Sequence, residues 1–290
     1  MIETIYIPTY RRTQRQLTWD NLPNKWKDRA LLVIAEDEYD ILSKNYPVVV
    51  CPHQGKAPEG KDMQEYGLSP TRKWVAYHAG PIKYAFLDDD INEFVYTARP
   101  SERNNYRLVN SPFGMRNTEP GFEDKFDEMM ETLDSWLNEY AMCGLEVTWN
   151  PPFEVDYKDC WRQTTNHFIN GSIFPNDEID FTSLTCAQDY YILLQCLTKG
   201  YANRVSLRYR VRPALTQASG GCAEYRTLDT HNTSMKKLHE AFPEFVTLKE
   251  KVAKGGSWGG LVKLAAVIQW KKAFQSSQKN KENTLGNFLR

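Results

Sequence analysis

The chain lacks several features that would narrow its function at once. None of its six cysteines stands in a C-x-x-C pair, so neither a zinc site nor a disulfide framework is indicated. Its charge is almost balanced, with 36 Lys and Arg against 37 Asp and Glu, which excludes coating of nucleic acid by bulk charge but allows a local basic face. No apolar segment is long enough for a signal peptide or a membrane span. We therefore expect a soluble cytoplasmic protein with reduced cysteines.

The first ninety residues alternate short apolar runs with helical patterns. The predicted strands are Thr4–Pro8, Ala30–Ala35, Pro47–Cys51 and Ile82–Leu87, and the predicted helices are Gln14–Leu22, Glu36–Lys44 and Pro70–Ala79. Ser69 is the expected N-cap of the third helix, with Pro70 at its first position. Such alternation is typical of an α/β fold with a mostly parallel sheet flanked by helices. The 290 residues fit one large domain or two closely joined lobes.

The second half of the chain has a less regular pattern. Apolar residues recur at helical spacing over Phe122–Tyr140, which predicts a core helix. The other predicted elements are strands over Glu146–Trp149, Cys160–Ile169 and Asn203–Val211, the last at a sheet edge, and helices over Ala187–Thr198, Thr233–Ala241 and Leu261–Phe274. The polar residues from Gln275 to Arg290 predict a loose tail.

Three acidic residues follow the apolar run that ends at Leu87. Because side chains alternate along a strand, Asp88 and Asp90 point to one side and Asp89 to the other. Two neighbouring carboxylates are costly unless a hard cation such as Mg²⁺ or Mn²⁺ neutralises them, and such ions commonly accompany phosphorylated substrates. Open sheets bind ligands at the carboxyl ends of their strands. The pattern favours a metal site over its alternative, a solvated acidic turn.

Four sequence pieces, in this order, resemble the GT-A glycosyltransferases. They are Ile5–Arg12, Gly67–Trp74, Leu87–Asp90 and Ala187–Asp189. More closely, the chain resembles the phage TET-associated glycosyltransferases, which attach sugars to hydroxymethylated pyrimidines in DNA. The further features of this likeness are Gln16, the pair Gly220-Gly221, and Tyr225-Arg226.

The resemblance covers roughly residues 3 to 245 and implies a Rossmann-like GT-A domain over 1–245. Residues 1–92 would form its nucleotide-sugar half and 93–245 its acceptor half, with 246–290 a C-terminal helical extension and polar tail. The implied activity is transfer of a sugar from a UDP-sugar to 5-hydroxymethylated pyrimidines in double-stranded DNA, with Mn²⁺ or Mg²⁺ as cofactor. A phage-encoded enzyme of this kind would act in the host cytoplasm.

The same resemblance implies roles at the metal. Asp90 would ligate the ion, Asp88 would contact the ribose or reach the ion through water, and Asp89 would hold the loop. His231 would complete the ligands, with His167 as a weaker candidate for that role. A lone histidine is also commonly an ordinary surface or core residue.

Nucleotide-binding roles are implied after the first two strands. Thr9 and Tyr10 would hold the base or ribose, and Glu36 would receive the base edge unless it only begins a helix. The candidates for the diphosphate, which a guanidinium binds bidentately, are Arg11, Arg12 and Arg72. Plain surface charge is the alternative for all three, and most of all for Arg12.

The implied general base is Asp189, which would deprotonate the acceptor hydroxyl and give inversion in a single displacement. Thr185-Cys-Ala-Gln188 has the form of a capping box, so a carboxylate in the first helical turn is the competing explanation. The helix N-terminus would keep Asp189 ionised at neutral pH and lower its basicity. A retaining outcome stays open.

The DNA-binding candidates lie on the predicted edge strand and in an acceptor loop. Arg208, Arg210 and Arg212 share a parity with Arg204 and would form a basic stripe for phosphates, although charged edge strands also prevent aggregation. A 5-hydroxymethyl group already projects into the major groove, so full base flipping is not obligatory, although an acceptor loop with Trp161 or Trp258 could still demand it.

Other functions fit parts of the pattern. The same fold can act on a glycan or protein acceptor. A nucleotidyltransferase could use the acidic cluster, although such enzymes usually carry a Gly-rich, basic N-terminal loop where this chain has Pro8-Thr9-Tyr10. A non-catalytic binder of DNA or sugar nucleotide would need none of the three carboxylates Asp88, Asp90 and Asp189.

Overall fold

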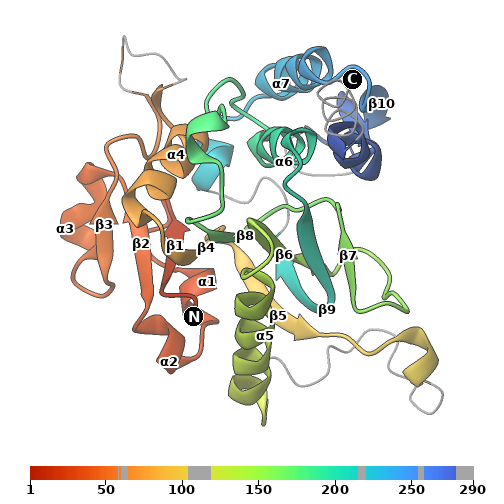
Figure 1. Ribbon diagram of the computed structural model, residues 1–290. Coiled ribbons are helices and arrows are strands. Elements are labelled where there is room, and N and C mark those ends of the chain that lie inside the picture. The colour runs from red at the N-terminus through yellow and green to blue at the C-terminus, as the bar shows by residue number, and fades with distance from the viewer. Residues whose placement is uncertain (58, 60–64, 104–118, 215–219, 254–257, 279–290) are drawn as a thin grey trace.

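A central sheet of nine strands organises the described chain (Figure 1). The computed structural model describes residues 1–57, 59, 65–103, 119–214, 220–253 and 258–278. The strand order is β3-β2-β1-β4-β8-β6-β9-β5, and β7 also pairs with β9. The strands are β1 (Thr4–Pro8), β2 (Ala30–Ile34), β3 (Val48–Val50), β4 (Lys83–Leu87), β5 (Ile91–Tyr96), β6 (Met142–Val147), β7 (Tyr157–Asp159), β8 (Asn166–Asn170) and β9 (Asn203–Pro213). The predicted α/β class is confirmed.

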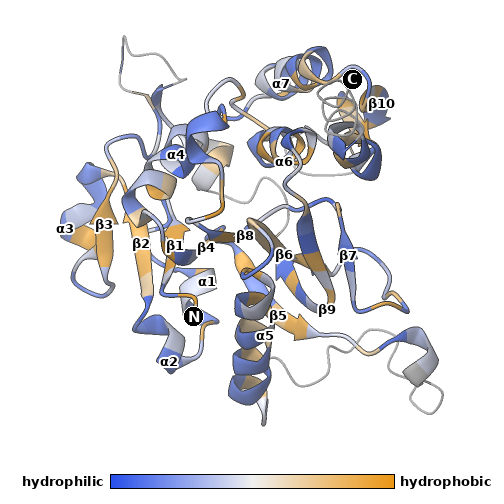
Figure 2. Cartoon of the chain, viewed as in Figure 1, coloured by the Kyte–Doolittle hydropathy of each residue, from blue (hydrophilic) through white to orange (hydrophobic). Residues whose placement is uncertain are grey.

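Helices cover both faces of this sheet. They are α1 (Leu17–Asp20), α2 (Asn24–Lys27), α3 (Tyr39–Leu42), α4 (Leu68–Ala79), α5 (Phe122–Trp136) and α6 (Gln188–Lys199), whereas α7 (Leu228–Ala241) packs against the strands within 246–268. Ile5 and Ile7 of β1 pack in a cluster with α5, whereas Tyr6 packs in a second cluster with α4 and α6. A strand buried on both faces reads as a continuous apolar run, and the orange strands of Figure 2 show this.

The strand directions bring distant residues to one edge of the sheet. β1 is parallel to β2 and β4, so the residues after β1 and β4 meet there. β8 is antiparallel to β4, with Leu87 opposite Asn166, and its first residues therefore lie at the same edge. The Asp88 N–H donates to the Thr165 carbonyl at 2.8 Å. The predicted nucleotide half and the predicted acceptor half thus share one continuous sheet.

β9 is an interior strand, so its predicted edge position is wrong. It pairs with β6 in parallel and with β5 and β7 antiparallel. Its arginines alternate with apolar residues as they would on a charged edge, but the charged groups find partners within the protein. The sequence pattern could not distinguish these two cases because both alternate with period two.

The predicted helix Leu261–Phe274 is also wrong over most of its length. β11 (Val262–Ile268) pairs antiparallel with β10 (Val246–Val252) in a separate two-stranded sheet, and a helix covers only 270–278. Short apolar runs fit a strand or a helix, and cross-strand pairing favours the strand here. Residues 279–290 of the predicted tail lie outside the described residues.

α4 begins two residues earlier than the sequence indicates. Its first residue is Leu68 and its N-cap is Gly67, with φ of 91°, so Ser69 is inside the helix. The Ser69 hydroxyl donates instead to the Leu184 carbonyl at 2.5 Å, which ties α4 to the segment before α6. No helix among the described residues has the length and apolar character needed to cross a membrane.

Candidate active site

The edge where β1 and β4 end borders a cavity of about 340 Å³. The predicted site residues on its wall are Tyr10, Arg12, Arg72, Asp88, Asp89, Asp90 and Asp189. Gly220, Gly221, Tyr225 and Arg226, which carry part of the family resemblance, also line it. Sequence pieces that are far apart in the chain therefore meet around one cavity, which is the arrangement expected of an active site.

Asp88 lines this cavity and has a buried carboxylate oxygen without a hydrogen bond. Its Oδ1 lies 3.7 Å from Arg72 Nη2, and no hydrogen-bond donor among the described residues satisfies it. Burial raises the pKa of Asp88, and the charges of Arg72, Arg12 and Arg226 oppose that rise. A buried acceptor surrounded by cations but without a hydrogen bond is suited to an additional positive ligand.

Asp89 is fixed by Arg12 on the inner side of the same turn. Arg12 Nη1 donates to Asp89 Oδ1 at 2.5 Å, and the two side chains are only 12% and 8% exposed. The Gln16 side-chain amide donates to the Arg12 carbonyl at 2.5 Å and holds this loop. Burial raises the pKa of Asp89 to about 7 despite the Arg12 charge. The predicted loop-holding role of Asp89 agrees with this geometry.

The two arginines after β1 lie in different places: Arg11 is outside the cavity and Arg12 lines it. Arg11 points outward to Asp37 at 2.8 Å, with both side chains about half exposed, and it lies outside the cavity wall. Arg12, the candidate for which plain surface charge was the strongest alternative, is the one that lines the cavity. Arg11 follows the end of β1 and has a left-handed backbone, with φ of 58°, so the side chains of Arg11 and Arg12 do not continue the alternation of a strand. Nothing in the residue type signals that turn.

The acidic turn offers two carboxylates to a divalent ion. Burial and the charge of Asp88 raise the pKa of Asp90 to about 6, so an approaching cation would relieve a real electrostatic cost. No group of three His, Cys, Asp or Glu side chains in the described part of the chain forms a complete metal site. Mg²⁺ and Mn²⁺ commonly take one or two carboxylates and complete their shell with substrate phosphates and water. Asp88 and Asp90 therefore fit such an ion.

Neither predicted histidine lies on the cavity wall. The His231 ring in α7 is hydrogen-bonded through Nε2 to the Leu264 carbonyl of β11 at 2.9 Å and packs against Trp258. His167 is buried within β8, and burial lowers its pKa well below the usual value. The hairpin β10–β11, which the sequence did not predict, supplies the partner that occupies His231.

Asp189 lies in the first turn of α6, as predicted, but without a capping box. The N-cap is Ala187, with φ of 57° and no side-chain cap hydrogen bond. A left-handed alanine is strained, and such strain is often found at functional sites. Burial raises the pKa of Asp189 to about 6, with the Asp88 charge adding to the rise and Arg72 opposing it. The expected lowering of its basicity is therefore wrong.

The predicted nucleotide-binding residues divide between the cavity and its surroundings. The Tyr10 ring lines the cavity and packs against Gly55, where a Cβ atom would come within 2.4 Å of it. Thr9 is buried behind it, and its carbonyl accepts from Gln54 Nε2 at 2.8 Å. Glu36 is exposed in the turn Glu36–Glu38 after β2, outside the wall.

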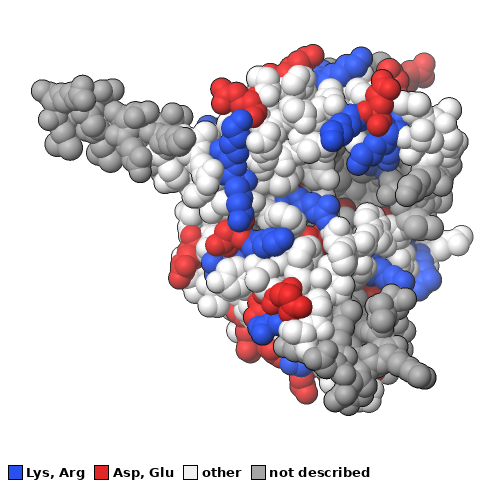
Figure 3. Space-filling model, turned by 90° about the vertical axis from the view of Figure 1, so that its right-hand side faces the viewer, with Lys and Arg blue, Asp and Glu red and all other residues white. Residues whose placement is uncertain are grey.

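The predicted DNA-binding arginines have internal partners. Arg208 bonds to the Tyr96 hydroxyl and lies 3.8 Å from Asp156. Arg210 is only 2% exposed, so the expected surface stripe of three arginines does not form. Arg212, paired with Glu93 at 3.2 Å, remains half exposed. In the face drawn in Figure 3, the described basic and acidic residues are interspersed.

Sequence reasoning missed several residues of the wall. They are Gln54, Trp149, Thr164, Thr165 and Tyr190. Trp161, the predicted acceptor residue, lies outside it and donates through Nε1 to Glu146 at 2.7 Å. Thr164 and Thr165 could have been found only with the antiparallel pairing of β8 and β4, because that pairing brings the start of β8 to the end of β4.

Comparison with known proteins gives one family and a distant structural likeness. A family model described as TET-Associated Glycosyltransferase matches residues 3–207. The crystal structure of S. aureus TarS 1-349 is similar at 13% identity and a TM-score of 0.43. The likeness covers 83% of this chain and 65% of that chain, so this chain spans less than two thirds of that structure. No curated protein sequence matches.

Proposed function

Because the chain belongs to the family of TET-associated glycosyltransferases, we propose that it is a metal-dependent enzyme acting on DNA. It transfers a sugar from a UDP-sugar to the hydroxymethyl group of a 5-hydroxymethylated pyrimidine. One observation carries this proposal: the carboxylates of Asp88 and Asp90 share a single cavity with Asp189. Such a cavity suits a metal-bound diphosphate on one side and a general base on the other.

The donor side is built from the acidic turn and the arginines around it. Asp88 and Asp90 would hold Mn²⁺ or Mg²⁺, and the ion would supply Lewis-acid stabilisation of the leaving diphosphate. Arg72 approaches Asp88 and can add a bidentate contact to phosphate oxygens. Arg12 fixes the turn through Asp89 at 2.5 Å and also lies 3.7 Å from Asp90 Oδ2, so it stabilises the turn that carries both metal-binding carboxylates.

The acceptor side is centred on Asp189. Its carboxylate removes the proton of the acceptor hydroxyl as that oxygen forms a bond to the anomeric carbon of the sugar. The bond from the anomeric carbon to the diphosphate oxygen breaks, and UDP leaves with the electron pair. A pKa near 6 keeps Asp189 ionised at neutral pH and more basic than an exposed aspartate. This single displacement inverts the anomeric centre.

Mass spectrometry of the acceptor tests the proposal. Purified protein, Mn²⁺ and a panel of UDP-sugars are incubated with duplex oligonucleotides that contain one hydroxymethylcytosine, one hydroxymethyluracil or neither. We expect UDP release and a mass gain of one sugar on a hydroxymethylated duplex, and no gain on the unmodified control. An unchanged DNA mass with every donor contradicts the proposal. Pyrophosphate release would indicate nucleotidyl transfer instead.

A further inference from the structure

A tryptophan of the cavity wall is held out in solvent. Trp149 is 59% exposed, yet it lines the same cavity as Asp189 and Thr164. Exposure of so large an apolar ring gains nothing for folding, so its place beside a cavity suggests a ligand. The chemistry proposed above gives Trp149 no role.

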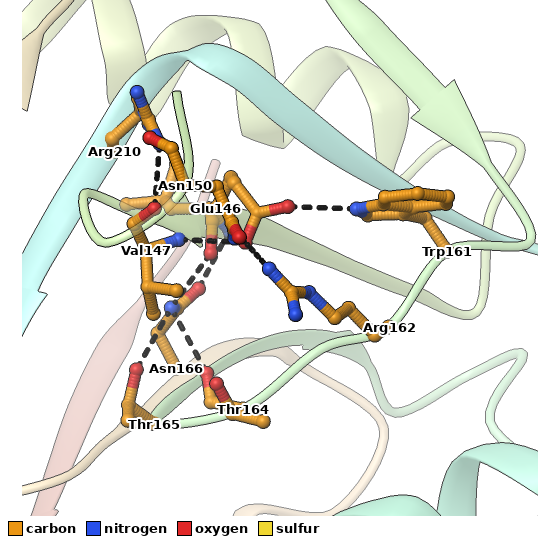
Figure 4. Close-up of polar contacts among 10 residues, drawn as sticks. Glu146, Val147, Asn150, Trp161, Arg162, Thr164, Thr165, Asn166 and Arg210 are labelled. Atoms are coloured by element: carbon orange, nitrogen blue, oxygen red, sulfur yellow. Dashed lines mark hydrogen bonds and ion pairs between the residues drawn. The ribbon is translucent and has the colours of Figure 1, made fainter. Parts of the chain in front are cut away.

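The backbone on both sides of this ring is firmly held. The Thr148 N–H donates to the Val211 carbonyl at 2.9 Å, and the Asn150 N–H donates to the Val147 carbonyl at 3.4 Å. The buried Arg210 donates through Nη2 to the Val147 and Asn150 carbonyls, at 2.6 and 2.5 Å (Figure 4). An arginine predicted to bind DNA phosphate thus stabilises the turn that carries Trp149.

Glu146 ties this turn to the neighbouring loop of the wall. Its side chain, which is buried, accepts from the Val147 N–H at 2.9 Å and from Asn150 Nδ2 at 3.0 Å. The same carboxylate accepts from Trp161 Nε1 at 2.7 Å and from Arg162 Nη2 at 3.2 Å (Figure 4). These two residues precede Thr164 and Thr165 of the wall.

From this arrangement we propose that Trp149 stacks on the pyrimidine base of the acceptor. This inference rests on the proposed function. Glu146 and Arg210 are its positioning residues. A rigid backbone with an exposed ring is preorganised for a planar partner, and bases stack well on aromatic side chains. Trp161 is less suited, because Lys158 Nζ covers its ring at 4.0 Å.

Stacking on Trp149 has a consequence for the DNA. A base within the duplex has both faces covered by its neighbours, so the acceptor base must leave the helix to expose a face to the indole. Because Asp189 lines the same cavity, a base stacked at this wall can present its hydroxymethyl group to the carboxylate.

Substitution of Trp149 tests the inference. Trp149→Ala should raise the KM for a hydroxymethylated duplex by roughly 5- to 150-fold, the range expected for loss of one stacked base. Trp149→Phe should restore most of the difference, and the affinity for UDP should stay unchanged in both variants. Tyr39→Ala is the matched control, because Tyr39 is also an exposed aromatic residue, at 48%, and lies outside the cavity wall.

A second readout needs no turnover. A 2-aminopurine placed beside the hydroxymethylated base should brighten when the parent protein or Trp149→Phe binds and unstacks that base, and should stay dim with Trp149→Ala. Equal brightening with Trp149→Ala, an unchanged KM, or an equal loss of UDP affinity overturns the stacking role. A parent protein that brightens the probe but transfers no sugar contradicts the proposed function instead.

Discussion

At the scale of single residues, the two arginines after β1 make the sharpest comparison. Arg12 neutralises the buried Asp89, whereas Arg11 pairs with Asp37 in solvent. Arg12→Met should reduce kcat/KM by about 10- to 100-fold, because it leaves a buried charge without its partner and releases the acidic turn. Arg11→Met, the matched control, should stay within about twofold of the parent. Steady-state transfer assays decide this, and equal losses in both variants would contradict the assignment.

The pKa of Asp189 sets an expected pH dependence of activity. As a general base it must be ionised, so kcat should rise with pH through about 6 and level off above about 7. A pH profile of single-turnover transfer at saturating Mn²⁺ measures this. Asp189→Asn should remove nearly all transfer while UDP affinity persists. A flat profile from about one pH unit below the expected value to about two units above it would oppose the role.

The same carboxyl affects stability with the opposite sign. Its folded pKa lies above the usual value, so stability is greatest when the group is protonated and is lost as pH rises from about 4 to about 6. Asp189→Asn should therefore raise the Tm by about 2–4 °C at neutral pH for each ~1 kcal/mol of relieved cost. Near pH 4 the gain should vanish. Thermal unfolding of both proteins at the two pH values checks this, and a gain that is independent of pH would refute it.

Single residues were predictable from the sequence where a chemically reactive side chain directly follows the end of a strand or begins a helix. Asp88, Asp90 and Asp189 share a cavity as expected, because the carboxyl end of a strand fixes where its next residues lie. Prediction failed where a single backbone angle decides direction, as at Arg11. Trp149 was missed because its exposure depends on a turn held by residues distant in the sequence.

At the scale of elements, the loop before β8 depends on a close contact with β6. A Cβ atom on Gly144 would lie 2.6 Å from the Gln163 side chain, and Gln163 Nε2 donates to the Cys143 carbonyl at 2.5 Å. Gly144→Ala should therefore lower the free energy of unfolding by about 1–3 kcal/mol, the usual cost of overpacking. Chemical denaturation measures this change.

The control for that prediction is Gly121→Ala. Gly121 has φ of 82°, and a Cβ atom there meets nothing within 4 Å, so only backbone strain of about 1–2 kcal/mol is added. We expect Gly144→Ala, but not Gly121→Ala, to reduce transfer as well, because displaced Gln163 would shift the adjacent Thr164 and Thr165. Unchanged transfer in Gly144→Ala would show that the loop position does not matter.

Helices and strands were predictable from the sequence mainly where their buried side chains give an uninterrupted run or a regular spacing of apolar residues. β1 matches its predicted bounds, and α5 and α6 agree within a few residues. β9 and β11 were misjudged because their environment depends on strand pairing, which no local pattern records. The partner of His231 could not be predicted for the same reason, since that partner is a backbone carbonyl of β11.

At the scale of the whole molecule, the site lies at the junction of two sheet halves. The parallel strands β3-β2-β1-β4 supply the acidic turn, and the antiparallel pairing of β8 with β4 adds the opposite wall. Neither half contains the complete cavity. This sheet joins the regions 1–92 and 93–245, which the sequence suggested as the two halves of the domain. We therefore expect the binding of donor and of acceptor to depend on both regions.

The most direct test of the central claim is calorimetric titration of UDP into the protein, with Mn²⁺ and with a chelator. If Asp88 and Asp90 hold an ion that binds the diphosphate, removing the metal should weaken UDP binding by about tenfold or more. Asp90→Asn should show the same weakening even with Mn²⁺ present. Equal UDP affinity in all three titrations would contradict the metal-bound diphosphate.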